Sequence, residues 1–205
     1  MSRGKNLRAV GIAVALTCGP LLTLAAQVAV HLSAGARYSA TLVHDSIVTP
    51  LDLRPGVGPA LGVGVALPAH RGWSGEALLE VSWSGLRRHD GTGQSEDLGG
   101  LGALSLSVAL RRALAPGLGV RATVGGLRYL PARLSGVFRD GARDVFPLIG
   151  VGVDYAPGRA RGVSVEARAD AHRFLTRALR DAGFTEHRLV PRVSLAVRAD
   201  LAALW

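Results

Sequence analysis

The chain has 205 residues and a mass of 21.3 kDa, a length that favours one domain with a sizeable core. With 48% hydrophobic and 19% charged residues, the composition excludes a disordered chain, and 5% aromatic residues with 10 prolines support neither collagen nor a coiled coil. The formal charge of +9 is spread along the chain rather than focused beside aromatic residues, which argues against a nucleic-acid partner.

Residues 1–26 read as a secretory signal peptide, because a basic start is followed by an apolar stretch over 9–24 and then by Ala25 and Ala26. We expect cleavage after Ala25 or Ala26 and a single mature domain over 27–205. An uncleaved membrane anchor is the alternative, since the apolar stretch is just long enough to span a bilayer.

Eight segments of the mature chain alternate between apolar and polar residues, with the period of two that is typical of β-strands. In chain order they cover 28–42, 57–67, 73–83, 104–110, 118–124, 145–155, 163–172 and 193–205. The seventh has the clearest polar face, because Glu166, Arg168, Asp170 and His172 alternate with valine and alanine.

The connections between these segments are alternately long and short. The long ones cover 44–55, 87–100, 130–144 and 173–190, and the short ones cover 68–72, 111–117 and 156–161. The short connections are rich in proline and glycine, as tight turns require. This alternation is expected when strands run up and down and all long loops emerge on one side. We therefore predict an all-β fold, an eight-stranded up-and-down antiparallel barrel.

Alternation alone is compatible with a soluble barrel whose apolar face points inward and with a transmembrane barrel whose apolar face points to lipid. Two features favour lipid. The alternating runs are long enough for tilted strands to cross about 25 Å of hydrocarbon. Aromatic residues lie near segment ends on the apolar face, as two interfacial girdles would place them: Tyr38, Trp73, Trp83, Tyr155 and Trp205.

The polar face mixes glycine, serine and charges of both signs, as a closed interior requires, because buried charges must be paired. We predict a charge network inside the barrel, made of Glu76, Glu80, Arg121, Glu166, Arg168, Asp170, His172, Arg192, Arg198 and Asp200. Arg37, Arg111 and Asp154 share this parity. The seventh and eighth segments are expected to face each other across one ladder and to form an ionic plug. Since side chains just fill an eight-stranded interior, a sizeable pore is not expected.

In these features the chain resembles the small eight-stranded bacterial outer-membrane barrels of the OmpA/OmpX type. The terminal run 193–205 ends on Trp205, in phase with the apolar face, and looks like the signal by which the barrel assembly machinery recognises that family. Trp replaces the usual terminal Phe, and no family-specific internal motif matches. The resemblance covers 27–205 and implies a bacterial outer-membrane location after signal cleavage, with outer-membrane lipid and lipopolysaccharide as partners.

The resemblance implies that the four long loops carry the function. We expect a non-enzymatic protein with a structural or surface-interaction role, whose ligand the sequence does not name. A lipid A modifying acyl hydrolase or transferase is the alternative, and a small-molecule or ion conduit is a third class.

Two groups of residues bear on the enzymatic alternative. His31 and Ser33 resemble the His and Ser pair of the lipid A deacylases, but their parity places them in the lumen. The adjacent residues 44–46 (His, Asp, Ser) are similar in type to the surface residues of the lipid A palmitoyltransferases, yet neighbours in one loop do not easily converge. The histidines show no metal-ligand spacing and the single cysteine, Cys18, lies in the signal segment, so no metal or cofactor is expected.

Overall fold

The computed structural model describes residues 28–45, 51–90, 94–134, 136–139, 144–158 and 162–201. The expected signal peptide at 1–26 and the terminal Trp205 lie outside these ranges.

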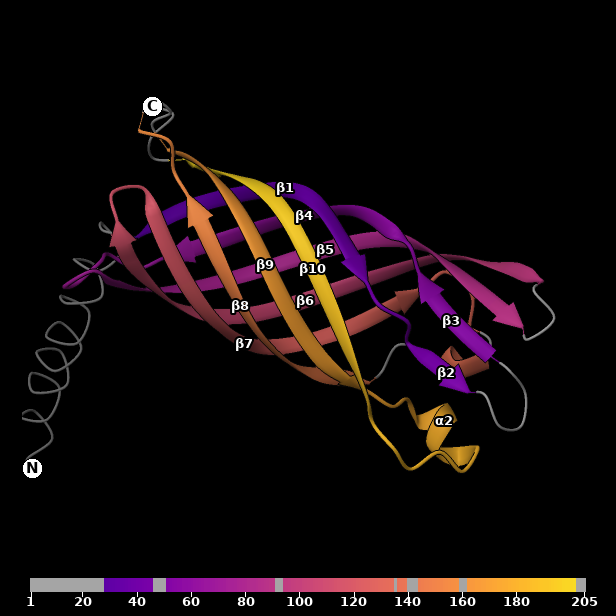
Figure 1. Cartoon of the computed structure of the whole chain (residues 1–205). Helices are drawn as coiled ribbons and strands as arrows, with labels where there is room; N and C mark the ends of the chain where they lie inside the picture. The colour runs from indigo at the N-terminus through magenta and orange to yellow at the C-terminus, as the bar shows by residue number, and fades with distance from the viewer. Residues whose placement is uncertain are drawn as a thin grey trace, which may run out of the picture.

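Eight long strands form a closed antiparallel barrel (Figure 1), as the sequence predicts. Each strand pairs with the next along the ring, and β1 pairs with β10 to close it. The barrel strands are β1 (Ala29–Ser39), β4 (Val57–Ala66), β5 (Trp73–Asp90), β6 (Ser95–Ala115), β7 (Leu118–Pro131), β8 (Val145–Tyr155), β9 (Val163–Phe174) and β10 (Arg188–Asp200).

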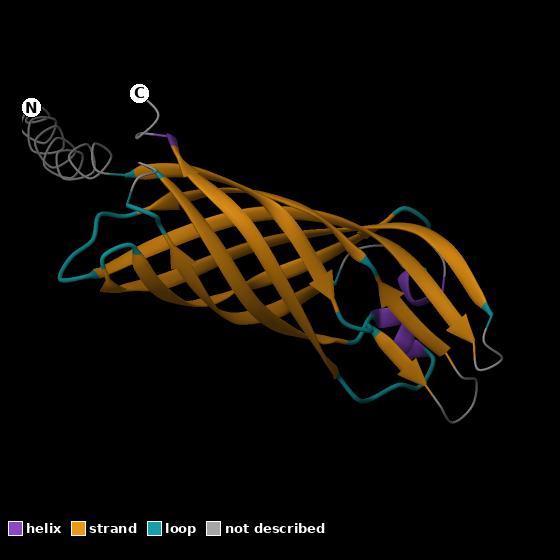
Figure 2. Cartoon of the chain, turned by 45° about the horizontal axis from the view of Figure 1, so that its top comes forward, coloured by secondary structure: helices purple, strands orange, loops and turns teal. Residues whose placement is uncertain are grey.

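The long loops contain more regular structure than the sequence predicts. The short strands β2 (Val43–Asp45) and β3 (Leu51–Pro55) form a hairpin, and β3 pairs with residues 86–90 at the loop end of β5. A 3₁₀ turn, η1 (Gly136–Phe138), and the short helix α2 (Arg177–Asp181) lie at the same end of the barrel (Figure 2). The expected loop 44–55 therefore contains β2 and β3. The expected loop 87–100 is largely strand, because β5 and β6 continue as a ladder to the pair His89 and Ser95.

Two other boundaries differ from the predicted ones. The last strand begins at Arg188 instead of 193 and ends at Asp200, because the chain continues the ladder through Pro191, whose carbonyl accepts a hydrogen bond from the Ala40 amide at 3.0 Å. The connection expected at 111–117 is only a turn at Pro116 and Gly117, since β6 remains paired with β7 as far as Ala115.

The barrel is apolar outside and charged inside. Outward side chains such as Leu106 and Val151, each 62% exposed, form an apolar band around it. A band of this extent is the surface that a hydrocarbon environment stabilises. Within the described ranges, no helix has the length and hydropathy needed to cross a membrane.

The interior has two layers. Charged side chains fill the middle and the short-turn end, and an apolar cluster closes the end with the long loops. This cluster is formed by Leu42, Val43, Leu53, Leu86, Leu101, Ala103, Leu127, Tyr129, Phe138, Phe146, Phe174, Leu175, Leu179 and Val190. Alternation along the sequence does not predict the cluster, because several of its members lie in segments expected to be loops.

Candidate functional site: the charged lumen and the loop end

Four inward-facing arginines lie on one hydrogen-bonded row that winds around the barrel. The row passes through Ser74, Arg111, Arg121, Gly152, Arg168, Ser194 and Arg37, each directly opposite the next. Four carboxylates occupy the neighbouring inward rows, two residues before or after the arginine row: Glu76, Asp154, Glu166 and Asp170. Diagonal neighbours in a sheet are within reach of long side chains, so this arrangement brings at least one acid to each guanidinium.

Glu76 is the centre of the network toward the short turns. Its carboxylate lies 2.7 Å from Arg198 Nη1, 3.2 Å from Arg121 Nη1 and 2.7 Å from His31 Nε2. Arg121 also contacts Glu166 at 3.0 Å, which extends the network across the lumen. Each group is buried, and the multiple partners offset the cost of removing these charges from water.

Asp170 and Glu80 hold the half of the network toward the loops. Asp170 Oδ1 accepts a hydrogen bond from Arg192 Nε at 2.6 Å, and Asp170 Oδ2 lies 3.4 Å from Arg37. Glu80 pairs with Arg37 at 2.7 Å and also with Arg168. Arg192 is 1% exposed, so the network reaches full burial here.

The ten residues predicted for the network are distributed as follows. Arg192 and Asp170 pair across β9 and β10, as a single ladder would place them, whereas Arg198 and Arg168 reach across the lumen to β5. Asp200 lies at the rim with a side chain 40% exposed and contacts Arg198 at 3.3 Å. His172 is fully buried beside the apolar cluster, where its Nε2 is 3.1 Å from the Tyr129 hydroxyl.

Four further residues belong to the network and were not among those ten. Arg37, Arg111, Asp154 and His31 all point inward, and their alternation with apolar neighbours is the signal that places them there. Their partners are not encoded locally, because contacts across a barrel depend on the strand stagger rather than on sequence spacing.

Inward-facing glycines make room for the long side chains. A Cβ atom added to Gly119 would lie 2.5 Å from the Arg111 guanidinium, and one added to Gly64 would lie 2.1 Å from His31 Nε2. The glycines on the polar face are therefore gaps that arginine and histidine side chains fill.

The position of His31 bears on acyl-transfer chemistry. His31 is 1% exposed and bonds to Glu76 through Nε2, so this histidine and its neighbour Ser33 belong to the filled lumen. A nucleophilic serine for lipid acyl chains needs to be reached from the hydrocarbon, and an inward parity does not provide that access.

The β2–β3 hairpin has its own polar cluster outside the barrel wall. Asp52 hydrogen bonds to His44 and accepts a bond from Arg54 Nη2 at 2.5 Å. The hydrogen bond from His44 is the main cause that holds the pKa of Asp52 below its ordinary value. The side chain of Asp45 and all of Ser46 lie outside what the structure describes.

Two hollows open at the loop end. One, of about 490 Å³, lies between the β2 hairpin and the segment after α2, and has Phe184, Glu186 and His187 in its wall. The other, of about 400 Å³, lies between β3, β6 and η1. Among the described residues, histidine and acidic side chains do not gather in a group that could hold a metal ion.

Four of the five predicted girdle residues fall in described strands and face outward. Trp73 and Tyr155, which are 40% and 55% exposed, lie at the short-turn ends of β5 and β8. Tyr38 and Trp83, which are 51% and 47% exposed, lie nearer the loops.

No family model matches the sequence, and no curated protein is similar to it. Solved structures do match the fold. The attachment invasion locus protein Ail of Yersinia pestis, in complex with the heparin analogue sucrose octasulfate, aligns with a TM-score of 0.50 at 10% identity, over 85% of this chain and 99% of that chain. The chain has the fold of the small eight-stranded outer-membrane barrels.

Two other solved structures show weaker likeness. A second structure of Ail aligns at 9% identity with a TM-score of 0.46, over 84% of this chain and 98% of that one. OprG of Pseudomonas aeruginosa aligns at 7% identity with a TM-score of 0.42, over 84% of this chain and 91% of that one. At such identities the likeness to the OmpA/OmpX type concerns the fold alone.

Proposed function

We propose that this protein lies in the bacterial outer membrane and binds an anionic surface ligand with its loop end. In the orientation that we propose, the short turns face the periplasm and the long loops face the cell exterior, as in other small barrels. The role is one of binding rather than catalysis or conduction.

The observation that carries the proposal is the folded cap at the loop end. Leu42, Leu53 and Leu179 are 0%, 3% and 8% exposed, although they come from three different segments beyond or at the barrel mouth. Buried contacts of this kind hold the β2–β3 hairpin and α2 in fixed positions over the lumen. A preorganised surface loses little conformational entropy on binding, which favours recognition.

Charge indicates the ligand class. In the described part of the loop end, ten arginines are exposed, against four exposed acids (Glu96, Asp97, Asp181 and Glu186). The arginines are Arg54, Arg87, Arg88, Arg128, Arg133, Arg139, Arg173, Arg177, Arg180 and Arg188. A surface with this excess attracts polyanions and raises their rate of association. A sulfated saccharide such as sucrose octasulfate, present in the Ail complex, is therefore a suitable probe.

The other two classes find less support. Lipid A modification by the His31 and Ser33 pair requires access from the hydrocarbon, and both side chains are inward. Conduction requires an open path, whereas paired arginines and the apolar cluster occupy successive layers of the lumen. These observations favour a closed barrel that displays a surface.

Binding can be measured by calorimetry on the refolded barrel in detergent, with sucrose octasulfate as the probe and sucrose as the neutral control. We expect salt-sensitive binding that weakens at least tenfold in the triple variant Arg133→Gln, Arg177→Gln and Arg188→Gln. Arg71→Gln, at the short-turn end, is the matched control and is expected to bind as the unmodified protein does. Equal affinity in both variants would contradict a role for the loop end.

Location and orientation need a separate measurement in intact cells. A cysteine at His187 is expected to react with a membrane-impermeant maleimide, and one at Gly158 is expected to react only after the outer membrane is opened. Labelling at Gly158 alone in intact cells would reverse the proposed orientation.

A further inference from the structure

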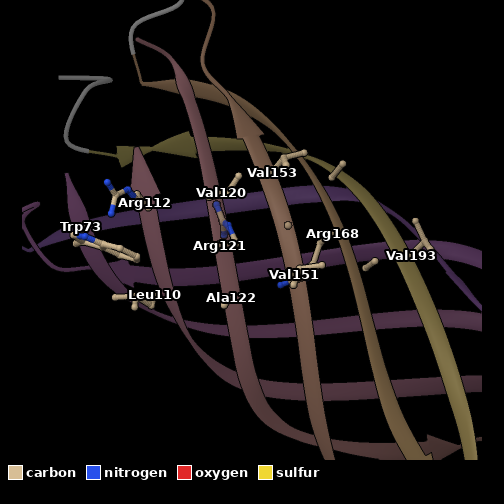
Figure 3. Close-up of a pocket in the computed structure, with 13 residues that line it drawn as sticks. Trp73, Leu110, Arg112, Val120, Arg121, Ala122, Val151, Val153, Arg168 and Val193 are labelled. Atoms are coloured by element: carbon tan, nitrogen blue, oxygen red, sulfur yellow. The ribbon is translucent and has the colours of Figure 1, made fainter. Parts of the chain in front are cut away.

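An apolar groove of about 690 Å³ runs along the outer wall of the barrel from β5 to β10. Figure 3 shows Trp73 and Arg112 at one end of it and Val193 at the other. Two inward arginines, Arg121 and Arg168, appear behind the wall and belong to the lumen network.

The groove exists because small outward residues are placed among larger ones. Ala122 lies opposite Leu110 on one side and Val151 on the other, and Ala169 lies between Val151 and Val193. An alanine side chain leaves the wall low where its neighbours project. Ala122, Ala167 and Ala169 therefore form the low parts of an apolar channel, between larger outward side chains such as Val151.

One end of this channel carries a cation. Arg112 shares the outward parity of Leu110, and its guanidinium carbon lies 4.9 Å from the centre of the Trp73 ring, on the strand directly beside it. Every other outward residue that lines the groove is apolar, so Arg112 is its one charged outward group. The stacked tryptophan fixes the guanidinium at the short-turn end, where the girdle meets the headgroup region.

We propose that the groove binds a glycerophospholipid of the periplasmic leaflet, with the phosphate on Arg112 and an acyl chain along Ala122 and Ala169. A planar guanidinium binds phosphate through paired hydrogen bonds, and an apolar channel of this size suits a hydrocarbon chain. A second copy of this chain would place an apolar wall against Arg112 and leave its charge uncompensated, which argues for a lipid occupant. Lipopolysaccharide fits less well, since its phosphates lie in the opposite leaflet.

This inference rests on the proposed membrane location, and the test separates the two. The barrel is refolded into vesicles that contain phosphatidylethanolamine, phosphatidylglycerol and lipopolysaccharide. It is then extracted in mild detergent, and the mass of the bound lipid is measured by native mass spectrometry. Insertion is scored first, by heat-modifiable migration. We expect the unmodified protein to retain one phospholipid, and Arg112→Gln and Ala169→Phe each to lower the retained fraction at least fivefold.

Val63→Phe, which enlarges an outward residue on β4 away from the groove, is the matched control and is expected to retain lipid fully. If all inserted variants retain lipid equally, the groove does not bind the phospholipid, and the proposed membrane location is unaffected. Retention of lipopolysaccharide in place of phospholipid, or a dimer that Ala169→Phe abolishes, would also overturn it. A protein that does not insert into any vesicle would overturn the membrane location itself.

Discussion

Arg111 and Arg121 lie directly opposite each other on β6 and β7, and the carboxylate of Asp154 on β8 binds both. The carboxylate receives two hydrogen bonds from Arg111 Nε, at 2.9 and 3.0 Å, and lies 3.4 Å from Arg121 Nη2. Like charges facing each other across a ladder repel, and Asp154 converts this repulsion into a shared attraction. Asp154 is thus the acid that the two arginines share, while Arg121 also contacts Glu76 and Glu166.

Removing that carboxylate charge is the first test of the lumen network. We expect Asp154→Asn to lower the free energy of unfolding by about 3 to 5 kcal/mol, because two arginines then face each other with fewer acids between them. Urea unfolding of the vesicle-inserted protein measures the change. Glu186→Gln, on an exposed loop, is the control and is expected to change stability by less than about 0.5 kcal/mol.

A second prediction compares two arginines that differ only in their surroundings. Arg168 is 8% exposed and pairs with Glu80, whereas Arg87 is exposed beyond the bulge of β5. Arg168→Ala is expected to cost about 3 to 5 kcal/mol, and Arg87→Ala almost nothing. Equal urea midpoints for the two variants would mean that the polar face is solvated instead of closed.

The sequence predicts the parity of this barrel well and its long-range contacts poorly. Parity is local, so the inward position of Arg168 and the outward position of Val197 follow from alternation alone. The pairing of Arg198 with Glu76, 122 residues apart, is set by how far the strands are staggered around the ring, which alternation does not encode. Alternation likewise places Arg37 on the inward face, whereas its contacts with Glu80 and Asp170 depend on the stagger.

The β2–β3 hairpin is not predicted from the sequence, for a different reason. Leu51 and Leu53 alternate with Asp52 and Arg54, a strand signal that is too short to stand out beside the glycines and prolines around it. Its stability comes from packing of Leu53 against the cap, a tertiary contact that no local pattern contains.

The glycines of the lumen allow a third prediction. A methyl group at Gly64 would collide with His31 Nε2, so Gly64→Ala is expected to displace the imidazole from Glu76 and to lower the free energy of unfolding by about 1 to 3 kcal/mol. In the background His31→Ala the same change should cost far less, because the colliding ring is absent. Additive effects of the two substitutions in urea unfolding would place the ring elsewhere.

The hairpin outside the barrel gives a prediction about pH. The pKa of Asp52 is lowered by its hydrogen bond to His44, so its contribution to the hairpin is complete above its ordinary value of 3.8 and is lost as the pH falls through the lower folded value. Amide resonances of Val43 and Leu53 in micelles are expected to shift with a midpoint below 3.8. Asp52→Asn removes the titrating group, and its spectra should stay constant over the same range.

The last prediction tests which side of the wall faces lipid. Leu195 and Val197 on β10 are 59% and 51% exposed and point outward, while Ala196 between them points inward, opposite Gly35 and Glu166. Because a strand has a period of two, one step along the chain moves a probe from hydrocarbon to lumen. Each position is replaced in turn by cysteine and labelled with a fluorophore, since Cys18 is the only natural cysteine and lies outside 27–205. In bilayers with lipid-borne quenchers, strong quenching is expected at 195 and 197 and weak quenching at 196. The reverse order would make the apolar face a core and the protein a soluble barrel.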